Sequence, residues 1–259
     1  MTALIQILRK FSTLAFLLAS VLLLVAWHKK GVLPPPQEID ARLHQEPIQR
    51  AVQQDKFTLE YRGSRYTVEP VADYQLWGLV VTHNDIEAFD DIYHDENSVD
   101  IKDLCVIWGD NLIEDTYREG IRFWSEPWTC YYQADSREVN DAFYRDALSN
   151  SHLLSAYESV REQIRSVRIG DQIMIKGQLV NYYPEGREYM RRKTSTIRSD
   201  TGNGACEVML VDSLSVLKSG TPGWYSAYEG SKILIGVVLL IKLILFLFAP
   251  YQSYAGPIK

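Results

Sequence analysis

The sequence predicts an α+β domain, mainly β, that forms a small OB-like Greek-key barrel with an interposed helix and is flanked by two transmembrane helices. Three observations predict this architecture. Two apolar runs lie near the ends of the 259-residue chain, at 11–27 and 233–250. Between them, segments with the period-two alternation of strands surround one helical pattern. The 16 Tyr and 6 Trp are typical of a β-rich core.

The first apolar run is predicted to be an uncleaved signal anchor that follows an amino-terminal tail, residues 1–10. Residues 11–27 carry no charge, and at about 1.5 Å per residue they reach roughly 26 Å. The run ends in Trp27, His28 and two lysines, which are typical of a membrane interface and not of a signal-peptidase site.

The second apolar run, 233–250, is predicted to cross the membrane although it contains Lys242. A lysine near the middle of a span costs about 2.5–3.5 kcal/mol, which the surrounding Leu, Ile and Phe offset. Two interpretations of Lys242 are open. It pairs with a carboxylate or with another subunit, or the helix is shifted or tilted so that the amine reaches the interface. A carboxy-terminal tail, 251–259, follows.

The two spans predict a two-pass protein of the cell inner membrane whose direct partner is the lipid bilayer. Lys and Arg counts on the two sides are close. The amino terminus, Arg9 and Lys10 precede the first span, which tends to set orientation. We therefore expect both termini in the cytoplasm and the domain between the spans in the periplasm.

The region between the spans is strongly acidic. All 33 Asp and Glu lie between Gly31 and Ser231, together with 20 Lys and Arg, so this region has a formal charge of −13. Such a charge repels phosphate backbones, which excludes nucleic acid as a partner and leaves a membrane or periplasmic protein as the expected one. No cofactor or metal site is predicted, and the GK[ST] of a Walker phosphate loop is missing.

The soluble β-rich domain is predicted at 57–217, between a Pro-rich tether at 28–56 and a linker at 218–232. A hairpin is expected over 57–71 with its turn at Gly63-Ser64, followed by a separate strand from Tyr74. Its Gly78 predicts a bulge or a close backbone approach.

The second half of the domain is predicted to begin with two short strands, or one edge strand, around Pro127. Apolar residues at 153, 154, 157, 160, 164 and 167 predict a helix capped by Asn150 or Ser151, after a weaker helix at 137–148. Strands are expected at 173–180 and 205–217.

Five pieces of the sequence, taken together, resemble an uncharacterised family of bacterial membrane-anchored proteins. They are YQLWGLVV (74–81), DLCVIWG (103–109), SNSHLL (149–154), GDQIMIKGQLV (170–180) and STIRSDTGNGACEV (195–208). The last piece, of the type SxxRxDTGxGACE, is the most specific. The resemblance covers roughly 57–217 and implies an amino-terminal anchor with the domain across the membrane, and no assigned activity. A second apolar segment is not a feature associated with that family.

The candidate catalytic residues are His152, Cys206 and Asp200, with Glu207 as another possible acid. A Cys nucleophile needs a base within hydrogen-bond reach and a third group that orients the base. The Gly-rich turn before Cys206 offers backbone N–H groups to an oxyanion. The alternative is structural: His152 holds a helix and a turn together, and Cys206 is buried in a strand.

A ligand loop is the second candidate site, with Arg198 for an anion and Thr201, Gly202, Asn203 and Gly204 as a backbone nest. Its alternative is an ordinary hairpin connection. The acidic loop 83–100 has neither EF-hand order nor tight metal-ligand spacing. The three cysteines, Cys105, Cys130 and Cys206, permit one bridge plus a free thiol, or three buried thiols.

These features give three function hypotheses. The first is a membrane-tethered interaction or assembly domain, because two anchors suit a scaffold or an accessory subunit. The second is a membrane-bound, thiol-dependent hydrolase that uses Cys206 and His152. The third is a cation-responsive sensor that uses the acidic loop 83–100.

Overall fold

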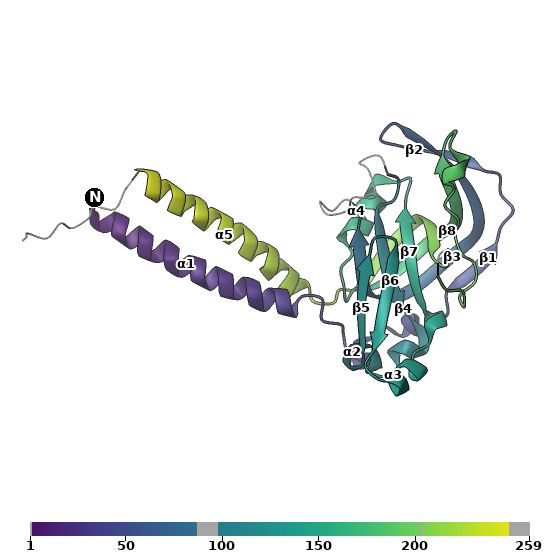
Figure 1. The fold of residues 1–259 in the computed structure, drawn as a ribbon, viewed down its shortest axis with the longest axis horizontal. Coiled ribbons are helices and arrows are strands. Elements are labelled where there is room, and N and C mark those ends of the chain that lie inside the picture. Colours follow the sequence, from purple (N-terminus) through teal and green to yellow (C-terminus); the bar gives the residue numbers. More distant parts are fainter. Residues whose placement is uncertain (1, 87–97, 203, 249–259) are drawn as a thin grey trace, which may run out of the picture. The chain divides into compact units, whose positions relative to one another are not determined.

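The structure is a computed structural model that describes residues 2–86, 98–202 and 204–248. The chain divides into two compact units, a helical unit (Met1–Gly31 with Thr221–Lys259) and a strand-rich unit (Val32–Gly220). The predicted fold class is confirmed at the level of an α+β protein, mainly β, with an apolar helix at each end. Figure 1 shows these elements.

The helical unit is an antiparallel pair formed by α1 (Thr2–Lys29) and α5 (Pro222–Phe248). Both helices are long and apolar enough to cross a membrane. Small side chains recur at seven-residue intervals on the buried stripe of α1, at Ser12, Ala19 and Ala26. Small residues let helix backbones approach closely in lipid, where van der Waals packing, and not the hydrophobic effect, drives helices together.

Lys242 has a partner inside this unit. Its Nζ donates to Thr13 Oγ1 on α1 at 2.8 Å, and Arg9 reaches Leu245 O at 3.4 Å. Thr13 lies only three residues from Lys10, so Lys242 lies near the charged end of α1, about 4.5 Å along the axis from Lys10. This position agrees with the shifted helix, and a contact of Lys242 with another subunit stays a prediction.

The strand-rich unit contains a seven-stranded mixed sheet and a separate two-stranded hairpin. The strands are β1 (Ile48–Ala51), β2 (Phe57–Tyr61), β3 (Ser64–Asp85), β4 (Lys102–Ile107), β5 (Ile121–Glu126), β6 (Thr129–Ala134), β7 (Leu148–Leu154), β8 (Gln172–Pro184) and β9 (Glu207–Lys218). The short helices are α2 (Thr116–Glu119), α3 (Arg137–Ala142) and α4 (Glu158–Ser166).

Five strands pair in a closed circuit, β3–β4–β7–β9–β8 and back to β3. All pairs in it are antiparallel except β7–β9, and α4 lies in the connection between β7 and β8. Inside the circuit, one face of each strand contributes to a shared core that includes Leu76, Val106, Leu153 and Met209.

Two glycines permit close approaches within this circuit. A Cβ on Gly177 would lie 2.0 Å from Leu210 O, where β8 and β9 shift register, and a Cβ on Gly78 would lie 3.1 Å from the Val106 Cβ. The close approach predicted at Gly78 is therefore present. Side chains at either position would push strands of the circuit apart.

Four predictions of elements and segment boundaries need correction. Residues 148–154 form strand β7 and not the start of a helix, so the helix around 151–167 is restricted to α4. The hairpin and the following strand are joined, because β3 runs unbroken over 22 residues. The predicted tether 28–56 includes β1 and contributes Leu43, which is fully buried. Likewise, α5 begins inside the predicted linker 218–232.

The hairpin β5–β6 has the two short strands predicted around Pro127. Its strands pair only with each other within the described residues. A disulfide between Cys105 on β4 and Cys130 on β6 joins it to the circuit, while Cys206 is a free thiol. One bridge plus a free thiol was one of the two arrangements that the cysteine count left open. The bridge therefore fixes the position of the hairpin tip.

Candidate functional site

The candidate site is built on β7, because alternate residues of a strand point to opposite faces. Asn150 and His152 point to the outer face of the circuit, and Ser149 and Ser151 point to its interior. Both sets are buried. Central strands of a sheet covered on both faces can therefore carry two separate polar clusters, and β7 does.

His152 lies directly opposite Asp103 of β4. The distance from His152 Nδ1 to Asp103 Oδ1 is 2.6 Å, and both side chains are almost completely inaccessible to solvent. The carboxylate that orients the imidazole is thus Asp103. Asp200, predicted for this role, accepts a hydrogen bond from Ser195 Oγ at 2.5 Å instead.

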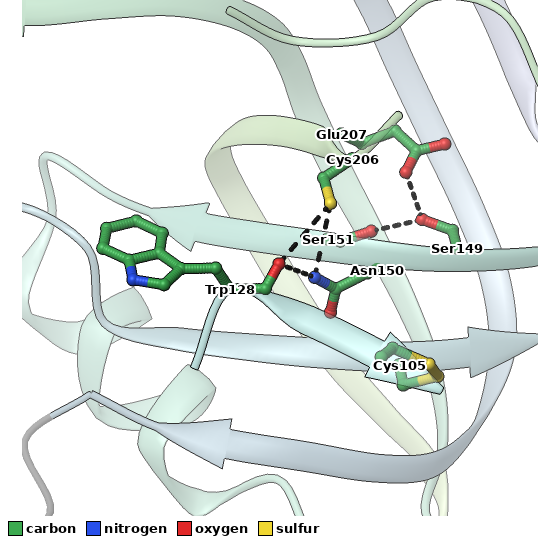
Figure 2. The surroundings of a disulfide bond; sticks show 8 residues. Cys105, Trp128, Ser149, Asn150, Ser151, Cys206 and Glu207 are labelled. Atoms are coloured by element: carbon green, nitrogen blue, oxygen red, sulfur yellow. Dashed lines mark hydrogen bonds between the residues drawn. A yellow bond between two sulfur atoms is a disulfide. The ribbon is translucent and has the colours of Figure 1, made fainter. Parts of the chain in front are cut away.

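Cys206 lies just before β9 and belongs to the same face as His152. A hydrogen bond between Cys206 and His152 contributes to the pKa of the imidazole. The sulfur also accepts from Asn150 Nδ2 at 3.5 Å and donates to Trp128 O at 3.7 Å, as Figure 2 shows. The structure thus brings together two of the three predicted catalytic residues and supplies Asp103 as a third.

Trp128, at the tip of the β5–β6 hairpin, covers this cluster. Its ring centroid lies 6.0 Å from that of His152 and 4.1 Å from the guanidinium carbon of Arg192. Trp128 has φ 73°, which side-chain-bearing residues seldom adopt and which costs on the order of 1–2 kcal/mol. The contacts of its ring and carbonyl, and the bridge two residues further at Cys130, hold it there.

The charge on His152 is set by opposing neighbours. Burial lowers the pKa of His152, but the hydrogen bond and the negative charge of Asp103 outweigh burial and raise this pKa to about 9. Arg192 opposes the imidazolium, because its Nη2 lies 2.5 Å from Nε2.

Several buried polar atoms of this cluster have no hydrogen-bond partner among the described residues. They are Asp100 Oδ1, Asp103 Oδ2, Asn150 Oδ1 and Arg192 Nε. Each such atom costs on the order of 1–3 kcal/mol, and packing alone offers no compensation for that cost. Burial also raises the pKa of the Asp100 carboxyl, which accepts a hydrogen bond from Tyr182. Clusters of this kind are candidates for function.

The interior cluster on the other face of β7 and β9 centres on Glu207. Ser149 Oγ donates to Glu207 Oε2 at 2.5 Å, and Ser149 and Ser151 hydroxyls lie 2.9 Å apart, as seen in Figure 2. Burial raises the pKa of Glu207 to about 7, and neither Ser149 nor the charge of Arg198 offsets this. Glu207 was predicted only as a possible acid for Cys206, and it points to the opposite face.

The predicted ligand loop is divided. The side chain of Arg198 contacts residues outside the loop: it donates to Pro47 O at 3.0 Å and to the Tyr74 hydroxyl at 3.4 Å. Thr201, Gly202 and Gly204 are exposed, and Asn203 lies outside the described residues. Arg198 therefore serves a different surface from the rest of the predicted nest.

Arg198 lines a solvent-open cavity of about 550 Å³, within the usual range of ligand pockets. Four separate segments contribute its walls, with carboxylates, one guanidinium and one exposed aromatic ring. The residues are His44, Glu46, Gly109, Asp110, Tyr144, Asp146, Ala147, Arg198 and Ser199. Trp108 Nε1 donates to Glu46 at 3.2 Å, which fixes one wall.

Most of the acidic loop 83–100 lies outside the described residues, at 87–97. In its described part, Asp85 pairs with Lys102 at 2.7 Å and His83 lies 3.7 Å from Asp85. Over the described ranges, no group of three or more His, Cys, Asp or Glu side chains is placed to hold a metal ion. Of the described acidic residues of this loop, Asp85 is thus engaged in an ion pair with Lys102, and Asp100 accepts a hydrogen bond from Tyr182.

Sequence reasoning missed Asp103, Trp128 and Arg192. The sequence did contain a signal for Asp103. It lies on the same face of an apolar strand as Cys105, where a buried charge needs a partner. For Trp128 and Arg192 no such signal exists, because their positions depend on loops.

Comparison with known proteins found no matching family model, no matching curated protein and no matching solved structure.

Proposed function

We propose that this protein is a two-pass inner-membrane protein that presents an OB-like interaction domain in the periplasm. The closed circuit β3–β4–β7–β9–β8 supports the OB-like assignment. A five-stranded barrel with one parallel pair and a helix between its third and fourth strands has this strand order. Resemblance to the uncharacterised membrane-anchored family remains part of the proposal. Its most specific piece, 195–208, contributes both Arg198 and Cys206.

The disulfide supports the periplasmic side. Structural disulfides persist in the bacterial periplasm and are rare in the cytoplasm, and Cys105–Cys130 joins two elements of the strand-rich unit. The prediction follows that an alkaline phosphatase fusion after Ile86 is active and a green fluorescent protein fusion there is dark. The reverse result overturns the orientation.

The observation that carries the interaction function is the 550 Å³ cavity between four loops. It is open, polar and bordered by Tyr144, whose exposed fraction is 55%. Its carboxylates, Glu46, Asp110 and Asp146, outnumber Arg198, which favours a basic side chain presented by a membrane or periplasmic protein. The fully buried His152 offers no comparable surface.

Site-specific photo-crosslinking tests this function in intact cells. A photoreactive phenylalanine replaces Tyr144 at the cavity, and the matched control replaces Tyr189, which is 85% exposed and does not line the cavity. We expect a discrete cross-linked product from position 144 alone, which disappears when Asp110 and Asp146 are both replaced by Lys. Equal products from both positions, or no product from 144, contradict the proposal.

A second function, thiol chemistry, is favoured by one observation: His152 contacts both Asp103 and Cys206. These are the parts of a Cys nucleophile, its base and the group that orients the base. The purified full chain should then release a burst of nitrophenolate from p-nitrophenyl acetate, and Cys206→Ala should abolish the burst. Failure of the wild-type chain to react eliminates this function and leaves the cavity proposal untouched.

A further inference from the structure

The disulfide and the free thiol lie in one row across the sheet. Cys105 of β4 is directly opposite Asn150 of β7, and the Asn150 amide contacts the sulfur of Cys206 at 3.5 Å. All three side chains are on the outer face, beneath the β5–β6 hairpin. A thiol and a disulfide therefore share one partly buried surface and are separated by a single strand.

We infer that Cys206 is an exchange partner of this disulfide, and that the protein interconverts between a Cys105–Cys130 bridge and a Cys130–Cys206 bridge. The sulfur of Cys206 attacks the sulfur of Cys130, a Cys130–Cys206 bond forms, and the Cys105–Cys130 bond breaks. Cys105 leaves as a thiolate and takes the proton that Cys206 gives up. One disulfide and one thiol exist before and after, so the step needs no external oxidant.

The geometry selects Cys130 as the sulfur that is attacked. Cys105 and Cys206 belong to strands of the circuit with β7 between them, so two strand spacings of about 4.8 Å separate their backbones by roughly 10 Å. A disulfide requires Cα atoms closer than about 7 Å, which rules out Cys105–Cys206. Cys130 belongs to the hairpin, and no ladder hydrogen bond holds the described hairpin strands to the circuit.

The contacts of the hairpin tip define the movement that brings Cys130 to Cys206. The Cys206 sulfur already touches the hairpin backbone at Trp128 O, two residues before Cys130. A shift of the hairpin along the direction of β6 by about two residues, or roughly 7 Å, brings Cys130 to the position of the Trp128 carbonyl. That shift moves the Trp128 ring off His152, so the exchange controls access to the polar cluster.

His152 supports the exchange through its charge. The thiolate is the attacking species, and the imidazolium of His152, hydrogen-bonded to Cys206, stabilises that thiolate. The release of Cys105 occurs at a fully buried position, where a thiol behaves as a small apolar side chain. The released thiol of Cys105 can therefore stay in the core after the exchange.

Disulfide mapping of full-length variants in detergent tests the inference. Each variant is treated with oxidised glutathione, free thiols are alkylated, and peptides are analysed by mass spectrometry without reduction. Cys105→Ala should contain a Cys130–Cys206 bridge, Cys206→Ala should keep Cys105–Cys130, and Cys130→Ala should have no bridge between Cys105 and Cys206. Circular dichroism verifies that each variant is folded.

If Cys105→Ala does not fold, disulfide mapping of the wild-type protein tests the inference instead. Incubated in a glutathione buffer and then trapped with acid, wild-type protein should yield Cys130–Cys206 peptides beside the Cys105–Cys130 peptides. His152→Gln should slow their appearance, whereas a merely structural His152 would leave the rate unchanged. A wild-type map without Cys130–Cys206, or a Cys105–Cys206 bridge in folded Cys130→Ala, overturns the inference.

Discussion

Two buried clusters lie back to back on β7 and β9, and they offset the cost of burial differently. In the outer cluster, Oδ1 of the oppositely charged Asp103 lies 2.6 Å from His152 Nδ1. The inner cluster sets only neutral hydroxyls, those of Ser149 and Ser151, near Glu207. Both central groups are almost completely buried, so burial alone does not decide whether an ionisable side chain is charged.

The pKa values follow the partners. Asp103 outweighs burial and raises the pKa of His152 to about 9, which keeps the imidazole charged at neutral pH. Burial outweighs the Ser149 hydrogen bond and raises the pKa of Glu207 to about 7, which keeps the carboxyl largely neutral below that pH. One strand pair thus carries a stable cation on one face and a titrating acid on the other.

The largest expected effect comes from removing the counter-charge of the outer cluster. Asp103→Asn leaves a buried imidazole without its carboxylate, and breaking a buried pair in this way costs about 3–5 kcal/mol. The free energy of unfolding of the detergent-solubilised chain, from urea denaturation, measures this. Asp141→Asn is the matched control, since Asp141 is 63% exposed beside Arg137 and should change stability by less than about 0.5 kcal/mol.

The pH dependence of stability is the next largest effect. Because the pKa of His152 is raised in the folded state, its contribution is fully present below its unfolded value of 6.5 and is lost as pH rises towards 9. At about 1.4 kcal/mol per unit the loss is about 3 kcal/mol. Urea midpoints between pH 6 and 9 measure it, and His152→Gln should remove this part of the slope. An unchanged slope contradicts the assignment.

The two clusters also differ in how far the sequence predicted them. The apolar ends of the chain and the turn before β3 follow from local patterns, since hydropathy and glycine act over a few residues. His152 and Cys206 were predicted as a pair from chemistry alone. Asp103 was not predicted, because its place depends on the register between β4 and β7, which no local pattern specifies.

The wrong start of the helix predicted at 151–167, of which only α4 is present, has a physical cause. Leu153 and Leu154 are both fully buried although they point to opposite faces of β7, since this central strand is covered on each side. The usual alternation of polar and apolar residues was therefore missing, and the next apolar positions completed a false helical period. Tyr157, counted within that period, is 59% exposed.

The inner cluster offers a prediction of opposite sign. Glu207→Gln keeps the shape of the side chain and the hydrogen bond from Ser149, but removes a group whose ionisation in the folded state is opposed by burial. A carboxyl with a raised pKa loses stability as pH rises from about 4.5 to about 7. Glu207→Gln should therefore stabilise the protein at pH 8 by about 1–3 kcal/mol and have little effect at pH 4. Destabilisation at pH 8 would show that the charged carboxylate is needed.

The smallest expected effect concerns the Trp128 ring that covers the outer cluster, and not the charges of that cluster. Trp128→Gly and Trp128→Ala both remove the ring that lies over His152 and Arg192. Glycine accepts φ 73° without the strain that alanine retains, so the glycine variant should be more stable than the alanine variant by about 1 kcal/mol.

The same pair of variants shows whether the ring shields His152. If it does, loss of the ring admits water, weakens the hydrogen bond to Asp103 and moves the histidine titration, followed by the NMR shift of its ring protons, from about 9 towards 6.5. Glu207, on the other face of the sheet, should titrate at about 7 in both variants and in the wild type. A change at Glu207 of the same size would mean that the two clusters are coupled through β7 and β9, because the ring itself covers only the outer one.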